Sequence, residues 1–394
     1  MPLFEGLSFG AEQNIVVVDI GEAYTKCGLA GETAPKCIIP SEVKDSKSGK
    51  VVKLWNYSNT DDLYEQLKDF FYRLYFRHLL ITPKDKHVVV VESLLCPSDF
   101  RETLAKVLFL HYKSASVLFA PSHMVCLMSV GTNTGLVMDA GYSETVVIPV
   151  YDGIPILKAW QAVPLAGKAI HSEIESKLKE YGTVEISLAD SVDEEVLENI
   201  KAQCCFVTDF KRAQHIFSVM KGNDKAKLPK PPPDVSFPLD GSNIIMVKGE
   251  IREHVCEVLF QQDNDEKSVA TLLLDSLVEC PIDVRRKLAE NIVILGGTAM
   301  LPGFYHRLRL ELYYLMSQLK YRKQLAVKVF KFHKPPAKEN YTAWLGGAMF
   351  GALETLQMRS LQRETYLQSC KLPDWCNVSL PTPETTHSVK RSTI

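Results

Sequence analysis

The sequence predicts an α/β fold with mixed sheets, on the strength of three observations. Short β-branched runs end in an Asp and a turn glycine at two places in the chain, residues 14–32 and residues 136–153. A third apolar run, in residues 291–298, ends in a pair of glycines. Segments with apolar residues at helical spacing separate these strands. Strands that alternate with helices are typical of α/β proteins.

The two stretches that contain an Asp each predict a strand followed by a tight turn. Residues 15–18 lead to Asp19 and Gly21, and the second run leads to Asp139 and Gly141. The runs are too short and too β-branched for a helix, and glycine lets the chain turn back. An Asp at a strand end suits the water shell of Mg²⁺, and turn N–H groups suit phosphate. The hairpins therefore predict one ligand held from two sides, although a single copy of this pattern more often only ends a strand.

Composition and charge exclude several classes of protein. The chain has 394 residues, 45 of them basic and 47 acidic, and no long basic run, so a nucleic-acid partner is not expected. The first ten residues form no signal peptide and no stretch reaches the length of a membrane span. The ten cysteines show no paired CxxC spacing, which argues against a zinc site or a disulfide framework. We expect a soluble, intracellular protein.

Between the hairpins, the pattern predicts a docked helix and a loop. The helix starts near residue 61, with Thr60 or Asp61 as its N-cap. Its buried face is expected to carry Leu63, Leu67, Phe70, Phe71, Leu74 and His78. Residues 41–50 are short, polar and charged, which predicts a surface loop, and the tail beyond residue 374 is predicted to be partly disordered.

An ordered set of segments resembles the actin family over nearly the whole chain. The segments are VVVDIGEAYTKCGLAGE, VVVVESLLCP, GLVMDAGYSETVVIPVYDG with LAGK downstream, ENIKAQCCFV, NIVILGGTAMLPGF and NYTAWLGGAMFGAL. The resemblance implies an actin-like fold of two lobes, each with an RNase-H-like mixed sheet flanked by helices. It places residues 1–126 and 341–394 in the first lobe, with a shortened small subdomain near 41–60, and residues 127–340 in the second.

The resemblance also implies a nucleotide site in the cleft between the lobes. ATP or ADP with Mg²⁺ is the implied ligand, and its occupancy is left open. Near the phosphates and the metal it places Asp19, Gly21, Lys26, Asp139 and Gly141, with Asp19 and Asp139 holding Mg²⁺ through water. Near the nucleoside it places Lys201, Gly296, Gly297, Thr298 and Met300.

Several positions depart from the family pattern in this site. Glu22 replaces a small hydroxyl residue and would direct a carboxylate toward the phosphates unless its side chain turns away. Tyr142 and Ser143 stand where the family has Asp-Gly. Ala202 stands where actin has a ribose-binding Glu, and Asn340 where a Lys lies by the adenine. The sequence therefore predicts an altered nucleotide site.

Hydrolysis is expected to be lost. Actins position the attacking water with a Gln and a His, and the corresponding positions here are Ser122 or a neighbour, and Val146. Valine cannot orient a water molecule. His123 is adjacent, but a histidine among apolar residues is more often a structural residue than a base. We therefore expect no catalytic residue and no enzyme activity.

Two further departures concern assembly. Residues 41–60 number twenty, less than half of what actin uses for the small subdomain whose mobile loop enters the next subunit at the pointed end. Residues 262–267 (QDNDEK) replace the apolar plug of actin with charge. An interface without apolar anchors is weak, so ordinary polymerisation is not expected.

Within the family, the chain is most similar to the branch of actin-related proteins at the pointed end of dynactin, on the segments MPLFEGL, FRHLL, FAPSH, DNDEKSVATLLLDSL and LPDWC. That resemblance implies a non-catalytic cap on the short actin-related filament, in the cytoplasm and cytoskeleton. The implied partners are the filament subunits, the other pointed-end subunits and, indirectly, dynein and cargo in microtubule-based transport. Two alternatives are an actin-related subunit of a nuclear chromatin-remodelling complex and an active sugar kinase or chaperone-type ATPase.

Overall fold

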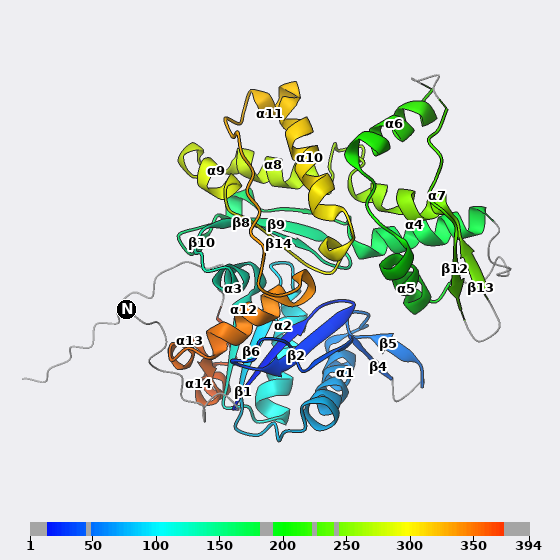
Figure 1. The fold of residues 1–394 in the computed structure, drawn as a ribbon. Coiled ribbons are helices and arrows are strands. Elements are labelled where there is room, and N and C mark those ends of the chain that lie inside the picture. The colour runs from blue at the N-terminus through cyan, green and yellow to red at the C-terminus, as the bar shows by residue number, and fades with distance from the viewer. Residues whose placement is uncertain (1–13, 45–48, 182–191, 223–226, 240–243, 374–394) are drawn as a thin grey trace, which may run out of the picture.

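Two β-sheets, each flanked by helices, form the body of the molecule (Figure 1). The structure is a computed structural model that describes residues 14–44, 49–181, 192–222, 227–239 and 244–373. The predicted tail beyond residue 374 lies outside these residues. Among the described helices, none is long and apolar enough to cross a membrane. The nine cysteines in this part of the chain are all free.

The first sheet has six strands in the order β15-β7-β6-β1-β2-β3. These are β1 (Ile15–Ile20), β2 (Tyr24–Leu29), β3 (Cys37–Pro40), β6 (His87–Glu92), β7 (Ser116–Pro121) and β15 (Leu361–Gln362). The pairs β1–β2 and β2–β3 are antiparallel, whereas β1–β6 and β6–β7 are parallel. The sheet is therefore mixed, as the sequence predicts, and its first hairpin begins at the N-terminal strand.

The second sheet repeats this arrangement with five strands. These are β8 (Gly135–Ala140), β9 (Thr145–Tyr151), β10 (Ile154–Pro155), β11 (Gln161–Val163) and β14 (Ile292–Leu295). An antiparallel hairpin, β8–β9, lies beside the parallel strand β14, just as β1–β2 lies beside β6. Asp19 and Asp139 thus occupy equivalent places near the ends of β1 and β8.

Helices lie outside each of the two sheets and between them, so that the molecule has five alternating layers of helices and sheets (Figure 1). Around the first sheet lie α1 (Thr60–Arg73), α2 (Ser98–Lys106), α3 (Ser122–Ser129), α12 (Thr342–Gly351), α13 (Leu356–Arg359) and α14 (Arg363–Ser369). Near the second lie α4 (Gly167–Glu180), α8 (Val269–Glu279), α9 (Ile282–Ala289), α10 (Phe304–Ser317) and α11 (Leu319–Arg322). Helices α5 (Glu194–Cys204), α6 (Phe210–Met220) and α7 (Gly249–His254) lie to one side of this sheet, on the side of α4 (Figure 1). Helices α3 and α12 lie between the two sheets and share one apolar cluster with the inner faces of both.

The close contact of α3 and α12 depends on glycine and on one tryptophan. A Cβ on Gly346 would lie 2.0 Å from the backbone oxygen of Val125, so only glycine allows the two helices to approach this closely. The fully buried Trp344 donates from Nε1 to the backbone oxygen of Val17 at 3.0 Å, which ties α12 to β1. The predicted division of the lobes at residues 126 and 127 falls inside α3, and the lobe boundaries remain a prediction.

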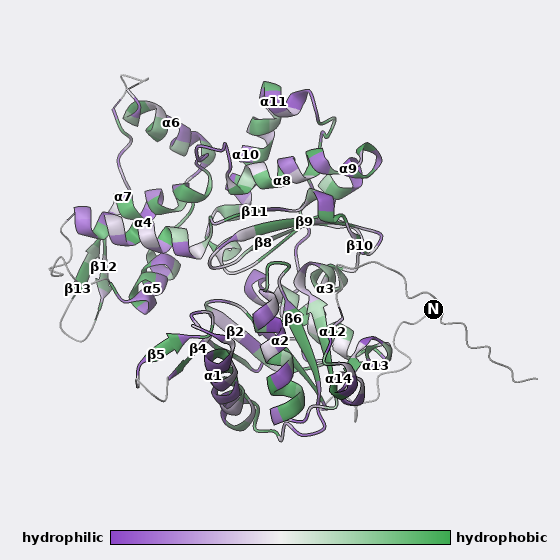
Figure 2. Cartoon of the chain, turned by 180° about the vertical axis from the view of Figure 1, so that it is seen from behind, coloured by the Kyte–Doolittle hydropathy of each residue, from purple (hydrophilic) through white to green (hydrophobic). Residues whose placement is uncertain are grey.

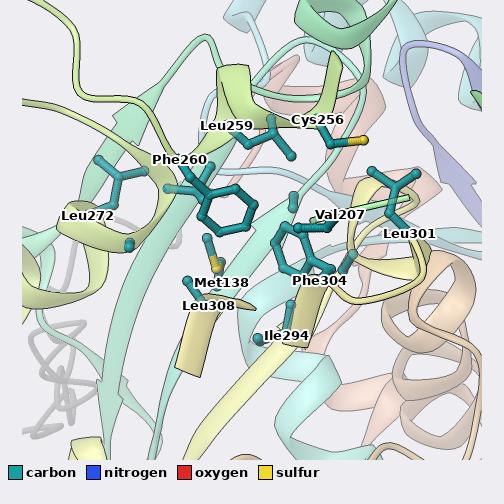
Figure 3. Packing of buried hydrophobic residues seen from close by; sticks show 14 of the residues in the cluster. Met138, Val207, Cys256, Leu259, Phe260, Leu272, Ile294, Leu301, Phe304 and Leu308 are labelled. Carbon is teal, nitrogen blue, oxygen red and sulfur yellow. The ribbon is translucent and has the colours of Figure 1, made fainter. Parts of the chain in front are cut away.

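The second lobe encloses the largest apolar core. Phe260 and Phe304 meet with ring centroids 5.9 Å apart, beside Met138 and Ile294 of the sheet (Figure 3). Strands of both sheets are hydrophobic, whereas helices such as α4, α5 and α9 carry hydrophilic stretches (Figure 2). Burial of apolar surface on this scale is the main stabilising contribution to the fold.

Helix α1 corrects two predictions. Its N-cap is Asn59, whose side chain accepts from the backbone N–H groups of Asp61 and Asp62, and not Thr60 or Asp61. The predicted apolar face is buried from Leu63 to Leu74, but His78 is exposed. The reason is a π-helical segment, Leu74–Leu79, that follows α1. Its wider turn shifts the phase of the buried face away from the 3.6-residue period.

Residues 41–50, predicted as a surface loop, are partly a strand. Glu42–Lys44 forms β4, which pairs antiparallel with β5 (Val51–Lys53). The polar sequence concealed this pairing because β4 buries one side chain only, Val43. A second small ribbon, β12 (Val235–Pro238) with β13 (Ile244–Val247), extends the other lobe.

Candidate functional site

A cavity of about 770 Å³ lies between the lobes, and both hairpins contribute to its wall. It is lined by all ten residues that the sequence places near a nucleotide: Asp19, Gly21, Lys26, Asp139, Gly141, Lys201, Gly296, Gly297, Thr298 and Met300. The fold thus brings together residues from four separate stretches of chain. Their contact with a nucleotide remains a prediction.

The first hairpin presents an ion pair to the cavity. Asp19 and Lys26 are direct partners across β1 and β2, with Lys26 Nζ 3.1 Å from Asp19 Oδ2. Gly21 closes the turn by donating its N–H to the Tyr24 oxygen at 3.2 Å. Its own oxygen accepts from Trp55 Nε1 at 3.2 Å, which fixes the back of the turn. The turn is thus held by one backbone hydrogen bond and by side chains outside the hairpin.

The second hairpin is fastened to the rest of its lobe. Gly141 donates its N–H to the Glu144 oxygen at 3.1 Å, and its oxygen accepts from Thr298 Oγ1 at 2.6 Å. The backbone oxygen of Tyr142 accepts from the backbone N–H of Lys168, at the start of α4, at 2.7 Å. These hydrogen bonds therefore connect the turn to α4 and to the glycine-rich segment after β14.

The glycine pair after β14 shows why this segment fits a ligand. Gly296 has φ +99°, and a Cβ there would lie 2.1 Å from the Ala140 oxygen, so glycine is required for packing. Gly297, by contrast, would place a Cβ in open space. Both line the cavity, so Gly297 exposes backbone there to a bound group. The segment thus leaves open space beside its backbone at Gly297.

The tips of the two hairpins touch across the cleft. The Ser143 hydroxyl donates to the Glu22 carboxylate, so the carboxylate that was expected to face the phosphates is directed to the opposite hairpin. Burial, and then repulsion by Glu22, raise the pKa of Glu144 nearby. The part of the cavity beside the hairpin tips is therefore acidic, and a polyphosphate placed there would need a cation.

A second bridge between the lobes lies beside the first. Lys53 of β5 places Nζ 2.5 Å from Glu194 Oε1 of α5, and the same carboxylate accepts from the Tyr142 hydroxyl. Lys53 Nζ also lies 4.7 Å from the centre of the Tyr142 ring. We call Lys53, Tyr142 and Glu194 the cleft latch. Burial opposes ionisation of Glu194, but hydrogen bonds from Lys53 and Tyr142 lower its pKa, so the latch is charged.

The acidic pair fits a hydrated cation. Burial first, and then the charge of Asp19, raise the pKa of Asp139 to about 6. Within the described residues, no group of three or more His, Cys, Asp or Glu side chains is arranged to hold a metal directly. Two carboxylates that repel each other suit Mg²⁺ bound through its water shell and through phosphate oxygens. The donor set fits that mode of binding.

The positions expected to replace the catalytic Gln and His also line the cavity. Ser122 and Val146 both belong to its wall. His123 does not belong to the wall, and burial lowers its pKa to about 4, so its imidazole is neutral. The buried position of His123 agrees with the interpretation that it is a structural residue and not a base.

Comparison with known proteins gives the family. Residues 62–371 match the family model described as Actin. The chain belongs to the actin family. It is 28% identical to "Actin-related protein 10" of Dictyostelium discoideum over 437 aligned positions, which cover 91% of this chain and 88% of that protein. The actin-like, two-lobed α/β fold expected from the sequence is confirmed, and the chain is an actin-related protein.

Some residues of the site were not expected from the sequence. Lys53 and Glu194 are 141 residues apart, so no local pattern could pair them. His171 and Glu198 form a cluster with Lys201, and of these only Lys201 was anticipated. The spacing of Glu198 and Lys201, three residues apart on a helix, was the one available signal.

Proposed function

We propose that this actin-related protein is a non-catalytic cap on the pointed end of the short actin-related filament of dynactin. The observation that carries the proposal is the size of the segment between β3 and α1. Among the residues described there, the two-stranded hairpin β4–β5 is the only regular structure, and in this proposal it is what remains of the small subdomain. Such a subunit can join a filament through its opposite face, yet it offers no long loop to the next subunit.

The turn at residues 262–267 supports the same proposal. Asp263 Oδ1 accepts from the N–H groups of Asp265 and Lys267 at 2.9 and 2.8 Å, which folds the segment into a compact turn. Residues 261–266 are all exposed and polar. An exposed polar turn lacks the apolar anchor that a buried filament contact requires.

In this proposal the cavity binds a nucleotide as a structural ligand. Asp19, Lys26 and Asp139 would hold Mg²⁺ and phosphates, and Lys201 with residues 296–300 would surround the nucleoside. A nucleotide that contacts both lobes stabilises the closed form by linkage, without turnover. Hydrolysis is absent from the proposal because serine and valine stand at the positions that orient water.

The proposed partners follow from the filament position. They are the actin-related filament subunits on one side and the other pointed-end subunits on the other, with dynein and cargo reached indirectly. The proposed location is the cytoplasm and the cytoskeleton. The relative's name supports an actin-related role and leaves these partners as proposals.

Pointed-end elongation of preformed actin-related filaments tests the proposal, with released phosphate measured in the same reaction. Substoichiometric protein should stop elongation and release no phosphate above background. As a matched variant, residues 45–50 replaced by the longer segment of actin should cap less well. Unchanged elongation with the natural chain would contradict capping, and isolation of the protein with nuclear remodelling subunits would favour the alternative role.

A further inference from the structure

Three ionisable side chains form a compact cluster at the wall of the cavity. Glu198 Oε2 lies 2.5 Å from Lys201 Nζ and 3.1 Å from His171 Nε2. Lys201 Nζ and His171 Nε2 are 3.2 Å apart. His171 and Lys201 are buried, whereas the side chain of Glu198 is 26% exposed and lines the cavity together with Lys201.

The hydrogen bonds leave one oxygen of Glu198 for a ligand. In the described part of the chain, His171 Nδ1 is buried without a hydrogen-bond partner. We assign the proton to Nε2, because a buried donor without an acceptor is rarer than a buried acceptor without a donor. His171 and Lys201 then both donate to Oε2, and the second oxygen, Oε1, remains to accept from the cavity.

Glu198 is ionised in this arrangement. Burial opposes the charge, but the hydrogen bond from His171 and the adjacent Lys201 lower the pKa of Glu198 to about 2. An ionised carboxylate only accepts hydrogen bonds. It repels phosphate and suits neutral donors such as hydroxyl groups.

Glu198 lies on α5 close to the position where the family resemblance implies a ribose-binding Glu and this chain has Ala202. Ala202 stands where the family resemblance places a ribose-binding Glu, and it too lines the cavity. Glu198 lies four residues earlier on the same helix, so the two positions share one face. Tyr142 packs edge-on against His171 with centroids 5.5 Å apart, which closes this subsite on the side of the second hairpin.

We propose that Glu198 accepts hydrogen bonds from the vicinal hydroxyls of the ribose, one helical turn away from the carboxylate that the family uses. His171 and Lys201 hold the carboxylate in place. The inference rests on the proposal that a nucleotide occupies the cavity, and it specifies a ribonucleotide.

Binding of ADP, 2′-deoxy-ADP and 3′-deoxy-ADP, each with MgCl₂, tests the inference by calorimetry on the full chain. A hydrogen bond to a charged group contributes roughly tenfold or more to affinity, so the natural protein should prefer ADP to one or both deoxy forms by about that factor. This comparison of ligands needs no mutation and does not depend on the folding of a variant.

Glu198→Gln supplies the protein side of the test. ADP should bind this variant more weakly, and its preference over the deoxy forms should fall toward unity. Glu195→Gln is the matched control, because Glu195 lies exposed on the same helix, is not part of the cavity wall and carries the same charge. An unchanged preference in Glu198→Gln would overturn the inference. Failure of the natural protein to bind ADP or ATP would instead refute nucleotide occupancy, and the inference with it.

Discussion

Disruption of the cleft latch is the most direct test of how the two lobes are held together. Lys53→Met keeps most of the side-chain stem and removes the charge, and Glu194→Gln keeps the shape of its partner. The side chains are 28% and 41% exposed, so solvent weakens the ion pair to about 0.3–1 kcal/mol. The contact of Lys53 with the Tyr142 ring adds about 0.5–1 kcal/mol. Lys53→Met should therefore cost about 1–2 kcal/mol in the free energy of unfolding.

A double-mutant cycle in urea isolates the Lys53–Glu194 contribution, which should be about 0.3–1 kcal/mol. Hydrogen exchange should also rise in residues 51–59 if the latch keeps the cleft closed. Lys179→Met with Glu175→Gln is the matched control, since that pair, 2.8 Å apart, lies within α4 and does not join the lobes. It should leave exchange at the cleft unchanged. A Lys53–Glu194 coupling near zero together with unchanged exchange would refute the latch.

Two further predictions concern the walls of the cavity. Gly296→Ala should cost at least about 4 kcal/mol in urea unfolding, because of its φ of +99° and the contact with the Ala140 oxygen, whereas Gly297→Ala should change stability by less than about 1 kcal/mol. Equal effects of the two would contradict that backbone contact. The raised pKa of Asp139, about 6, means that the native protein binds more protons than the unfolded chain between about pH 4 and pH 6, so stability falls as pH rises through this range. Without metal or nucleotide, Asp139→Asn should therefore stabilise the protein by about 2 kcal/mol more at about pH 7.5 than at about pH 4.5, and a gain independent of pH would count against the raised pKa.

Elements whose signals are local could be predicted closely. The third apolar run, predicted as a strand within residues 291–298, forms β14 (Ile292–Leu295). The two hairpins follow from short β-branched runs beside a glycine, since these features act within a few residues. Prediction from local sequence was wrong where the backbone departs from the regular period of the α-helix. The π-helical segment Leu74–Leu79 reversed the expected burial of His78.

The candidate site shows the same division. The Asp-x-Gly spacing of the two hairpins already indicates a ligand, and the resemblance to the actin family supplies the rest of the ten expected residues, Lys201 on α5 among them. One cavity collects them all. The contacts of Glu22 with Ser143 and of Lys53 with Glu194 could not be predicted, because each joins segments more than a hundred residues apart. From the sequence alone, Glu22 could be recognised as a carboxylate expected near the phosphates, but its partner Ser143 could not.

The sequence by itself determined the alternation of strands and helices, the equivalence of the two Asp-glycine hairpins and the resemblance to the actin family. These depend on residue type and on spacing along the chain. Only the tertiary structure decided that the hairpin tips meet, that β5 is bound to α5, and that Glu198 lies on the cavity face of α5 beside His171. Each of these contacts joins side chains of different elements, Ser143 with Glu22, Glu194 with Lys53 and Glu198 with His171, so it exists in the folded chain alone.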